Sequence, residues 1–459
     1  MSDGSGQYDD ADDGTNGEIH DQAMKEFVLL NGNVVSSKGI HKADVLVMNG
    51  KIAAVGTGAA GRKNIPFIDL KGRHVLPGLI DVHVHFRTPG MTKKEDWVTG
   101  SKAALAGGVT TVLDMPNTRP PTVNAHSLQE KRKLVKAKAL VNYGFYAGAT
   151  PQNFQAIKKM KGVAGVKIYM GSSTGNLLVD DRKVLEKFFS DKKHIFAIHA
   201  ESESCIHEHM KKAGLSNDPV IHSAIRPPEC AYEAVKEVLH LAKKYGTRVH
   251  LCHVSTQKEL DTVRKFKNEN VSVEVTPHHL FLSSKDYAEY GNLMKVNPPI
   301  REIADQTALW EGIKDGTVDM IATDHAPHLL FEKEGSYPTV PSGVPGVQTM
   351  LPLLLNAVNE RHLSLEKVVE LTSANPAQRF GIKGKGAIEA GMDADIAVVD
   401  MGLREKVYRQ YLWSKCGWSP FEGWVLKGWP EMTFVNGNLM YEWRARFGTI
   451  KGREVQFDR

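Results

Sequence analysis

Two histidines separated by one residue follow an apolar run near residue 80. His83 and His85 lie in the stretch LIDVHVHFR that ends at Arg87. Side chains two apart on a strand point to the same face, so both imidazoles can reach one point. Imidazole nitrogen is a common ligand of zinc and other transition metals. The pair could therefore form half of a metal site, or could be two hydrogen-bonded surface histidines.

Other potential ligands stand near the ends of later apolar stretches. They are Lys167, His199, His253 and Asp324. Taken singly, each histidine would fit a hydrogen-bonded core residue, the lysine would reach solvent, and the aspartate would cap the turn that follows. Because such residues recur at successive strand ends, the pattern favours one convergent metal site.

The elements that must position these residues alternate from residue 75 onward. Strands are predicted at 75–85, 110–115, 141–147, 166–170, 195–199, 248–253, 272–276 and 319–323, with helices at 97–106, 127–138, 182–189, 232–244 and 256–268. Eight strands with helical crossovers predict a (β/α)8 barrel, and a doubly wound open sheet is the alternative. The barrel is favoured because it would gather polar residues from many strand ends at one mouth.

The two chain ends have a different character. Residues 26–76 form short alternating stretches with Asn-Gly turns at 31–32 and 49–50, and similar stretches return at 394–400 and 432–441. We expect both ends to pair into one composite β-sandwich domain. The predicted division is a disordered acidic leader (1–23), the N-terminal part of the small domain (24–76), the barrel (77–385), and the C-terminal part with a tail (386–459).

Composition excludes several function classes. The net charge of +5 is spread along the 459 residues without a basic block, so nucleic-acid binding is not indicated. We find no apolar run of membrane-spanning length and no signal core. The four cysteines show no C-x-x-C spacing, which is typical of a reducing compartment. We therefore expect a cytoplasmic protein that acts on a small molecule.

Together these motifs resemble the amidohydrolase superfamily, and within it the cyclic amidohydrolases: dihydroorotases, allantoinases and dihydropyrimidinases (hydantoinases). The resemblance covers roughly residues 26–445 and includes VKIY at 166–169 and TDHAPH at 323–328. It implies two Zn²⁺ per subunit, held by His83, His85, Lys167, His199, His253 and Asp324. A protonated lysine cannot bind a cation, so Lys167 is expected to be carbamylated and to bridge the two ions. Asp324 is also expected to act as the general acid and base.

Arg87, two residues after His85, bears on the choice of substrate. A guanidinium fork matches a carboxylate, and among the candidate rings dihydroorotate carries one. An arginine that pairs with an acidic residue of the barrel is the ordinary alternative. The resemblance also implies substrate contacts from Asn117, Asn297, His328, Ser342 and Gly343. Both asparagines also suit turns, and His278 and His279 are expected to be structural.

These residues favour the dihydroorotase pattern, in which N-carbamoyl-L-aspartate and L-dihydroorotate are interconverted in pyrimidine (UMP) synthesis. The alternatives are an allantoinase, a dihydropyrimidinase, or an inactive homologue that serves as a scaffold. A homodimer or higher homo-oligomer is expected, as is association with a separate aspartate carbamoyltransferase. The long loop at 329–345 is expected to close over bound substrate.

Overall fold

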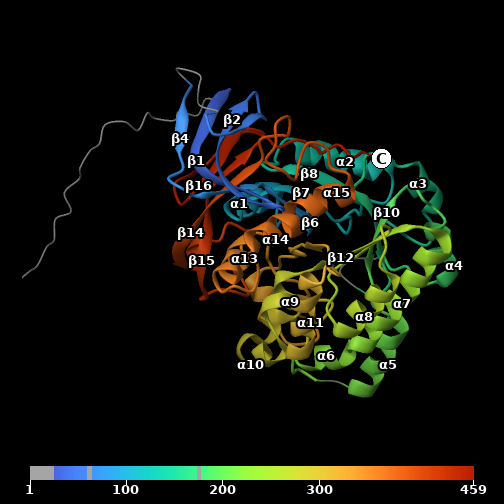
Figure 1. Ribbon diagram of the computed structural model, residues 1–459. Coiled ribbons are helices and arrows are strands. Elements are labelled where there is room, and N and C mark those ends of the chain that lie inside the picture. Colours follow the sequence, from blue (N-terminus) through green and yellow to red (C-terminus); the bar gives the residue numbers. More distant parts are fainter. Residues whose placement is uncertain (1–24, 59–64, 173–176, 215, 459) are drawn as a thin grey trace, which may run out of the picture.

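The structure is a computed structural model that describes residues 25–58, 65–172, 177–214 and 216–458. The predicted leader, residues 1–23, lies outside these ranges. The described chain forms a barrel of parallel strands surrounded by helices, with a smaller sheet packed beside it (Figure 1).

Eight parallel strands build the barrel, and each pairs with the next one along the chain. They are β6 (Leu79–Val84), β7 (Val109–Asp114), β8 (Asn142–Gly148), β9 (Gly165–Tyr169), β10 (Ile195–His199), β11 (Arg248–Leu251), β12 (Val271–Val275) and β13 (Met320–Ile321). A parallel bridge between Val84 and His325 links the two ends of this series. The strand order never reverses, so the barrel prediction is confirmed and the doubly wound alternative is wrong.

Helices surround the barrel, most of them between successive strands and the last four after β13. The longer ones are α1 (Trp97–Ala106), α2 (Ala125–Lys136), α4 (Arg182–Phe189), α5 (Glu203–Ala213), α7 (Pro228–Tyr245), α8 (Gln257–Phe266), α11 (Ile303–Lys314) and α13 (Met350–Asn359). The shorter ones are α3 (Phe154–Lys159), α6 (Ile221–Ile225), α9 (Pro277–Phe281), α10 (Tyr287–Tyr290), α12 (Leu330–Lys333), α14 (Leu365–Val369) and α15 (Asn375–Phe380). Side-chain caps fix several starts: Asp96 accepts from two amides of α1, and Thr256 forms a capping box with Glu259 at α8.

The smaller sheet draws its strands from both ends of the chain. Its N-terminal strands are β1 (Glu26–Ser36), β2 (Gly39–Met48), β3 (Lys51–Gly56), β4 (Phe67–Asp69) and β5 (His74–Pro77). Its C-terminal strands are β14 (Ile396–Lys406), β15 (Val425–Val435), β16 (Asn438–Glu442) and β17 (Arg446–Phe447). All are hydrogen-bonded into one nine-stranded sheet, in which β5 joins the two halves by pairing with β1 and β14. The predicted composite β domain is therefore confirmed.

One predicted strand proves to be two. The stretch 75–85 is divided between β5, which belongs to the small sheet, and β6, which belongs to the barrel. The chain changes sheets at Gly78, whose N–H donates to the Asp395 carbonyl 2.8 Å away. A Cβ at Gly78 would lie only 2.3 Å from the side chain of Thr110, so this close approach requires glycine.

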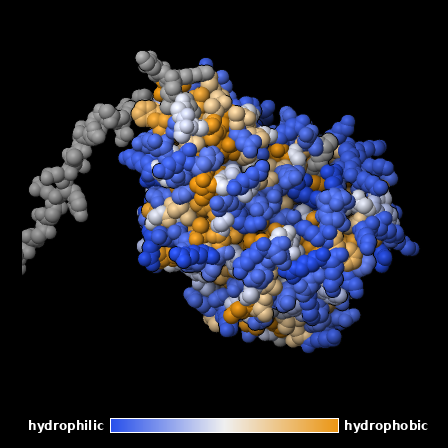
Figure 2. Space-filling view, in the orientation of Figure 1, coloured by the Kyte–Doolittle hydropathy of each residue, from blue (hydrophilic) through white to orange (hydrophobic). Residues whose placement is uncertain are grey.

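Each sheet has its own apolar core. The barrel core is built from the inward-facing and helix-facing residues of its strands, whereas the small sheet packs around side chains such as Phe27, Val45 and Phe434. Figure 2 shows the face seen in Figure 1 as largely hydrophilic, with hydrophobic residues gathered toward the small sheet. Within the described ranges, no helix combines the length and apolar character needed to span a membrane.

Candidate active site

The histidine pair and Asp324 meet at the carboxyl end of the barrel. His83 is the fifth residue of β6 and His85 follows its end, whereas Asp324 follows β13. Asp324 Oδ1 lies 3.2 Å from His83 Nε2 and 2.9 Å from His85 Nε2. One ligand atom from each residue lies within 4.8 Å of the others, so the three side chains could hold a metal ion. The structure thus brings together His85 and Asp324, 239 positions apart, as the barrel prediction required.

The second nitrogen of each histidine is already engaged. His83 Nδ1 donates to the carboxylate of Glu274, and His85 Nδ1 donates to Asn117 Oδ1 at 2.7 Å. These bonds leave both Nε2 atoms for a ligand, which is the arrangement that orients metal-binding histidines. Asn117, predicted to contact substrate, therefore orients His85 in the structure.

Lys167, His199 and His253 lie beside this group. Lys167 on β9 is buried, its Nζ lies 3.0 Å from Cys252 Sγ, and it forms no ion pair with a described carboxylate. His199 Nδ1 lies 3.0 Å from His253 Nε2, and the His253 ring centre is 5.5 Å from that of His83. Burial and the positive charge of Lys167 lower the pKa of both His199 and His253. His199 and His253 therefore face one another as neutral imidazoles. They lie beside Lys167, which has no acidic partner among the described residues.

Glu274 was not predicted to be part of the site. It lies in β12, is fully buried, and accepts hydrogen bonds from His83, from His250 Nε2 at 2.8 Å and from the His253 amide at 3.1 Å. Despite burial, these histidines hold its pKa well below the usual range, so it stays ionised. The one hint in the sequence was a charged residue within the short stretch VSVEV, which forms a wholly buried strand.

A second buried carboxylate supports Asp324. Asp81 accepts from the Thr323 amide at 3.1 Å and from the Thr323 hydroxyl at 2.5 Å, which fixes the residue before Asp324. Asp324 itself has a positive φ of 46°. Despite burial, His83 and His85 hold the pKa of Asp324 well below its usual range. At neutral pH its side chain is therefore a carboxylate, the form that accepts a proton.

Arg87 is a buried guanidinium without an acidic partner among the described residues. It is 1% exposed, its Nε donates to the Pro327 carbonyl at 3.3 Å, and its Nη2 lies 3.1 Å from His328 Nε2. The ordinary alternative, in which this arginine pairs with an acidic residue of the barrel, is not what the structure shows. A buried guanidinium that lacks a carboxylate is suited to bind an anionic ligand.

The remaining predicted substrate residues lie around the same mouth. Asn297 Oδ1 accepts from His222 Nε2 at 2.8 Å, and Asn297 and Ser342 both line a cavity of about 440 Å³. The Ser342 carbonyl lies 3.1 Å from His328 Nε2. The Gly343 amide donates to the Lys295 carbonyl at 2.9 Å, so it is engaged within the protein rather than directed at a ring.

The segment 329–345, predicted to close over substrate, is held by two buried lysines. Lys333 Nζ donates to the carbonyls of Lys295 and Pro341 at 2.9 and 3.0 Å. Lys295 Nζ donates to the carbonyls of Pro338 and Val340 at 2.8 and 2.6 Å. These bonds fasten the backbone of the segment to the barrel mouth, and its closure stays a prediction.

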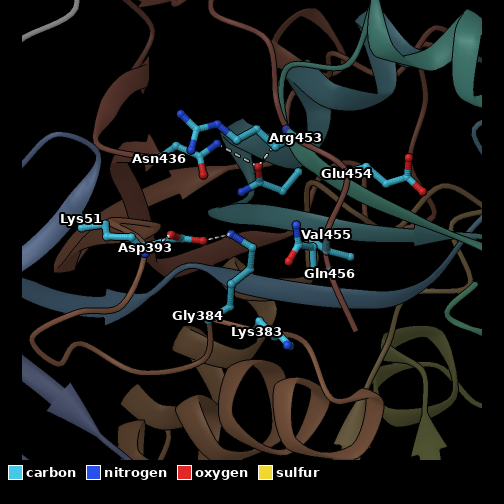
Figure 3. Close-up of a pocket in the computed structure, with 11 residues that line it drawn as sticks. Lys51, Lys383, Gly384, Asp393, Asn436, Arg453, Glu454, Val455 and Gln456 are labelled. Carbon is cyan, nitrogen blue, oxygen red and sulfur yellow. Dashed lines mark hydrogen bonds and ion pairs between the residues drawn. The ribbon is translucent and has the colours of Figure 1, made fainter. Parts of the chain in front are cut away.

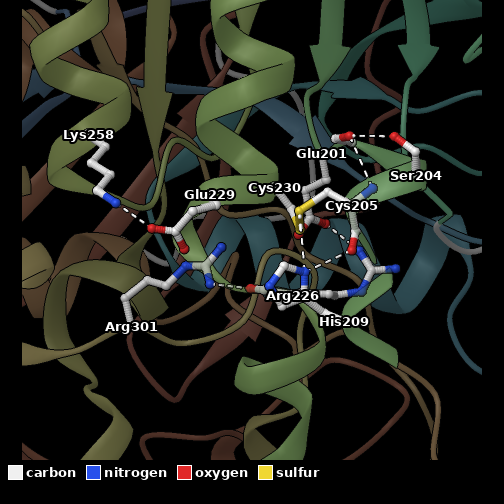
Figure 4. The surroundings of a disulfide bond; sticks show 10 residues. Glu201, Ser204, Cys205, His209, Arg226, Glu229, Cys230, Lys258 and Arg301 are labelled. Carbon is white, nitrogen blue, oxygen red and sulfur yellow. Dashed lines mark hydrogen bonds and ion pairs between the residues drawn. A yellow bond between two sulfur atoms is a disulfide. The ribbon is translucent and has the colours of Figure 1, made fainter. Parts of the chain in front are cut away.

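Figure 4 shows a disulfide that the cysteine spacing did not indicate. Cys205 and Cys230 are bonded across 25 positions and join the starts of α5 and α7, whereas Cys252 and Cys416 are free. Beside the disulfide, Glu201 pairs with Arg226 and lies 3.1 Å from His199 Nε2. This ion pair was not predicted from the sequence.

A second cavity, of about 300 Å³, lies at the opposite end of the barrel (Figure 3). Asp393 lies between Lys51 and Lys385, at 2.9 and 3.0 Å from their ammonium groups. Asn436 Nδ2 donates to Asn142 Oδ1 at 2.8 Å. The acid, the two lysines and the two asparagines named here are thus paired with each other.

A barrel whose strand ends gather histidines, a lysine and an aspartate belongs to the class of barrel enzymes that carry their chemistry at the carboxyl face. The model of the amidohydrolase family matches residues 74–440. The chain therefore belongs to the amidohydrolase family.

Relatives of known name agree over most of the chain. It is 40% identical over 434 residues to the dihydroorotase of Methanosarcina acetivorans, covering 91% of this chain and 92% of the relative. It is 37% identical to the dihydroorotase of Halobacterium salinarum, covering 92% and 96%. Among solved structures, the L-hydantoinase (dihydropyrimidinase) of Arthrobacter aurescens superposes with a TM-score of 0.90 at 31% identity, covering 94% of this chain and all of that one.

Proposed function

We propose that this protein is a dihydroorotase, a hydrolase of cyclic amides that interconverts L-dihydroorotate and N-carbamoyl-L-aspartate. The observation that carries the assignment is Arg87, a buried guanidinium at the mouth without a carboxylate partner among the described residues. Dihydroorotate bears a ring carboxylate that this fork matches. Relatives named dihydroorotase at 40 and 37% identity support the same substrate.

The donor set fits a pair of zinc ions. Buried imidazole nitrogens, a carboxylate and a lysine converge there, and His253 Nδ1 has no partner among the described residues. Lys167 is buried without a carboxylate partner, and carbamylation by CO2 would replace its repelled positive charge with an anion. The residues that would hold the ions are His83, His85, Lys167, His199, His253 and Asp324. Zinc bound there would supply Lewis acidity that polarises the amide carbonyl.

The protein's own groups would bind the substrate and move the proton. Arg87 would hold the ring carboxylate, with His328 beside it, and so orient the amide toward Asp324. The carboxylate of Asp324 would accept a proton from the water that attacks the amide carbonyl and return it to the ring nitrogen as the C–N bond breaks. Ring closure needs the protonated form of Asp324, so we expect closure to be favoured at lower pH.

The nearest rival activity is that of the structural neighbours, which are named hydantoinases and dihydropyrimidinases. Their fold is shared, so the fold does not choose between these substrates. Hydantoin, dihydrouracil and allantoin lack a carboxylate, which would leave the buried guanidinium of Arg87 without a partner. An inactive scaffold is disfavoured because all six candidate ligands are present.

Parallel ring-opening assays on dihydroorotate, dihydrouracil, hydantoin and allantoin test the assignment. We expect dihydroorotate to be the preferred substrate. Arg87→Ala should lower its kcat/KM roughly 100-fold, as expected for the loss of a charge-assisted contact, and Arg87→Lys should recover only part of this. Preference for an uncharged ring, or unchanged turnover of dihydroorotate by Arg87→Ala, would overturn the proposal.

The cellular setting belongs to the same proposal. A dihydroorotase would act in the synthesis of pyrimidine nucleotides, in the cytoplasm, and as a homodimer or higher homo-oligomer. Association with a separate aspartate carbamoyltransferase would place the enzyme next to the source of carbamoyl aspartate. Light scattering of the pure protein, alone and with that enzyme, would measure both associations.

A further inference from the structure

Lys94 has no assigned role, yet it contacts the ring of His328. It lies in the loop between β6 and α1, the same loop that carries Arg87. Its Nζ lies 2.9 Å from His328 Nδ1 and 2.8 Å from Glu332 Oε1. Glu332 is fixed in turn, because its other oxygen accepts from the Leu329 amide at 2.9 Å.

The neutral His328 ring carries only one N–H. Burial and the charges of Arg87 and Lys94 hold the pKa of His328 far below its usual range, so the ring is neutral. A neutral imidazole has one donor nitrogen and one acceptor nitrogen. Which nitrogen donates therefore depends on the partners that the ring meets.

Lys94 and the Ser342 carbonyl together determine that choice. The Lys94 ammonium can only donate to Nδ1, and the Ser342 carbonyl, 3.1 Å from Nε2, can only accept. Both contacts are satisfied when the ring proton lies on Nε2, whereas a proton on Nδ1 would satisfy the contact with Arg87 alone. The Trp418 indole, which donates to the His328 carbonyl at 2.8 Å, helps to hold the residue in place.

This tautomer changes what Arg87 can do. Arg87 Nη2 lies 3.1 Å from His328 Nε2, but an Nε2 that carries a proton cannot accept from it. Nη2 then has no acceptor among the hydrogen bonds of the described residues, while Nε keeps its bond to the Pro327 carbonyl. With the other tautomer, Nε2 would accept from Arg87 and occupy part of its fork.

We propose that Lys94 is a positioning residue that fixes the tautomer of His328 and thereby keeps the fork of Arg87 open for the substrate carboxylate. This inference rests on the proposed function. It assigns to the pair Lys94–Glu332 a part in specificity, because a ring without a carboxylate would gain nothing from an open fork.

Four variants test the inference by steady-state kinetics in both directions. Lys94→Met removes the donor, Lys94→Gln can donate or accept, and Lys94→Arg only donates. The exposed neighbour Lys93, changed to Met, is the control. We expect Lys94→Met and Lys94→Gln to raise KM for dihydroorotate about tenfold with kcat nearly unchanged, the size of a weakened hydrogen bond to a charged group. Lys94→Arg and Lys93→Met should stay close to the parent enzyme.

A spectroscopic measurement reads the tautomer directly. In protein labelled with ¹⁵N-histidine, the His328 signals can be assigned by their loss in His328→Asn. We expect an unprotonated Nδ1 and a protonated Nε2 in the parent enzyme, and a mixture of tautomers in Lys94→Met. A proton on Nδ1 in the parent, or an unchanged KM in Lys94→Met, overturns the inference. If the parent enzyme does not turn over dihydroorotate, the proposed function fails instead, and the tautomer remains measurable.

Discussion

Two buried polar clusters lie at opposite ends of the barrel, and they differ in how far their groups are paired. The base cluster consists of Asn142, Lys385, Asp393, Asp395 and Asn436. Asp395 accepts from Lys385, from Asn142 Nδ2 at 2.9 Å and from the Asn436 amide at 2.7 Å. Lys385 also contacts Asp393 at 3.0 Å. The protein itself thus satisfies the charged groups at the centre of this cluster.

The mouth cluster, formed by Arg87, Lys167, Tyr169, His253 and Asp324, contrasts with it. Arg87 and Lys167 form no ion pairs, and the Tyr169 hydroxyl and His253 Nδ1 have no hydrogen-bond partner, within the part of the chain that the structure describes. A buried polar group without a partner destabilises a fold by about 1–3 kcal/mol. Several buried polar groups without partners at one end of a barrel therefore indicate a ligand-binding site. The base cluster, by contrast, joins the barrel to the small sheet.

The largest expected effect comes from Asp324 in the mouth cluster. Asp324→Asn keeps the shape of the side chain but cannot carry a proton. We expect kcat to fall about 10²–10⁴-fold in both directions, the usual contribution of general acid–base catalysis, with substrate binding better retained. Zinc content must be measured in the same preparation. A variant with full zinc and near-normal kcat would show that the proton travels through another group, with His328 the next candidate.

In the base cluster the same kind of change should act on stability rather than on turnover. Asp395→Asn leaves the buried ammonium of Lys385 with Asp393 as its remaining acidic contact. We expect the free energy of unfolding to fall by about 3 kcal/mol, as for a broken buried ion pair, and kcat per folded molecule to stay unchanged. Urea unfolding provides the measurement.

Asp393→Asn is the matched control for this change. The Asp393 side chain is 22% exposed whereas that of Asp395 is 4% exposed, so water can replace part of what Asp393 loses. A smaller loss of stability is therefore expected. Equal losses in the two variants, or a loss of turnover in Asp395→Asn, would contradict the division between the clusters.

Much of the positioning framework could be predicted from the sequence, because it depends on local pattern. The predicted helices 97–106 and 182–189 coincide with α1 and α4, where apolar spacing and an aspartate cap agree. The first strand was predicted too long because the apolar run is continuous across Gly78. Periodicity shows that residues are buried, but it does not show that the chain changes sheets between them.

The supporting contacts of the site could not be predicted, because they join residues far apart in sequence. Glu274 and His83 are 191 positions apart, and the bond between Cys205 and Cys230 spans 25. The Trp418 indole donates to the His328 carbonyl across 90 positions, which ties this C-terminal segment to the mouth.

A fall in pH should affect stability differently at the two ends of the barrel. At the mouth the group that responds is His222, which lines the cavity there. Burial and nearby Arg226 lower the pKa of His222 to about 3, against an ordinary 6.5. The stability that neutral His222 contributes is therefore present above pH 6.5 and is lost as the pH falls toward 3. Between pH 7 and 5 the loss should be about 2 kcal/mol. At the base, Asp395 and Asp393 raise the pKa of Lys385 despite burial, so that ammonium stays charged in this range.

Unfolding measured at several pH values checks this expectation. In His222→Asn the decline in stability between pH 7 and 5 should be smaller by about 2 kcal/mol than in the parent protein. His126→Asn, at an exposed histidine, is the control. A loss of stability in His222→Asn that is the same at every pH would mean that the residue acts through packing alone.

The smallest effect compares two buried tyrosines, Tyr146 in the apolar interior of the barrel and Tyr169 in the mouth cluster. The Tyr146 hydroxyl donates to the Val82 carbonyl at 3.1 Å, whereas the Tyr169 hydroxyl has no partner among the described residues. Tyr146→Phe should lower the free energy of unfolding by about 1 kcal/mol, the net value of one hydrogen bond. Tyr169→Phe removes a buried hydroxyl without breaking a bond within the protein, so we expect the free energy of unfolding to rise by about 1 kcal/mol, the lower end of the cost of an unpaired buried polar group. Both substitutions keep the ring, so packing is matched. Equal losses in the metal-free protein would mean that the Tyr169 hydroxyl is paired within the fold, and the contrast between mouth and base would then not extend to this residue.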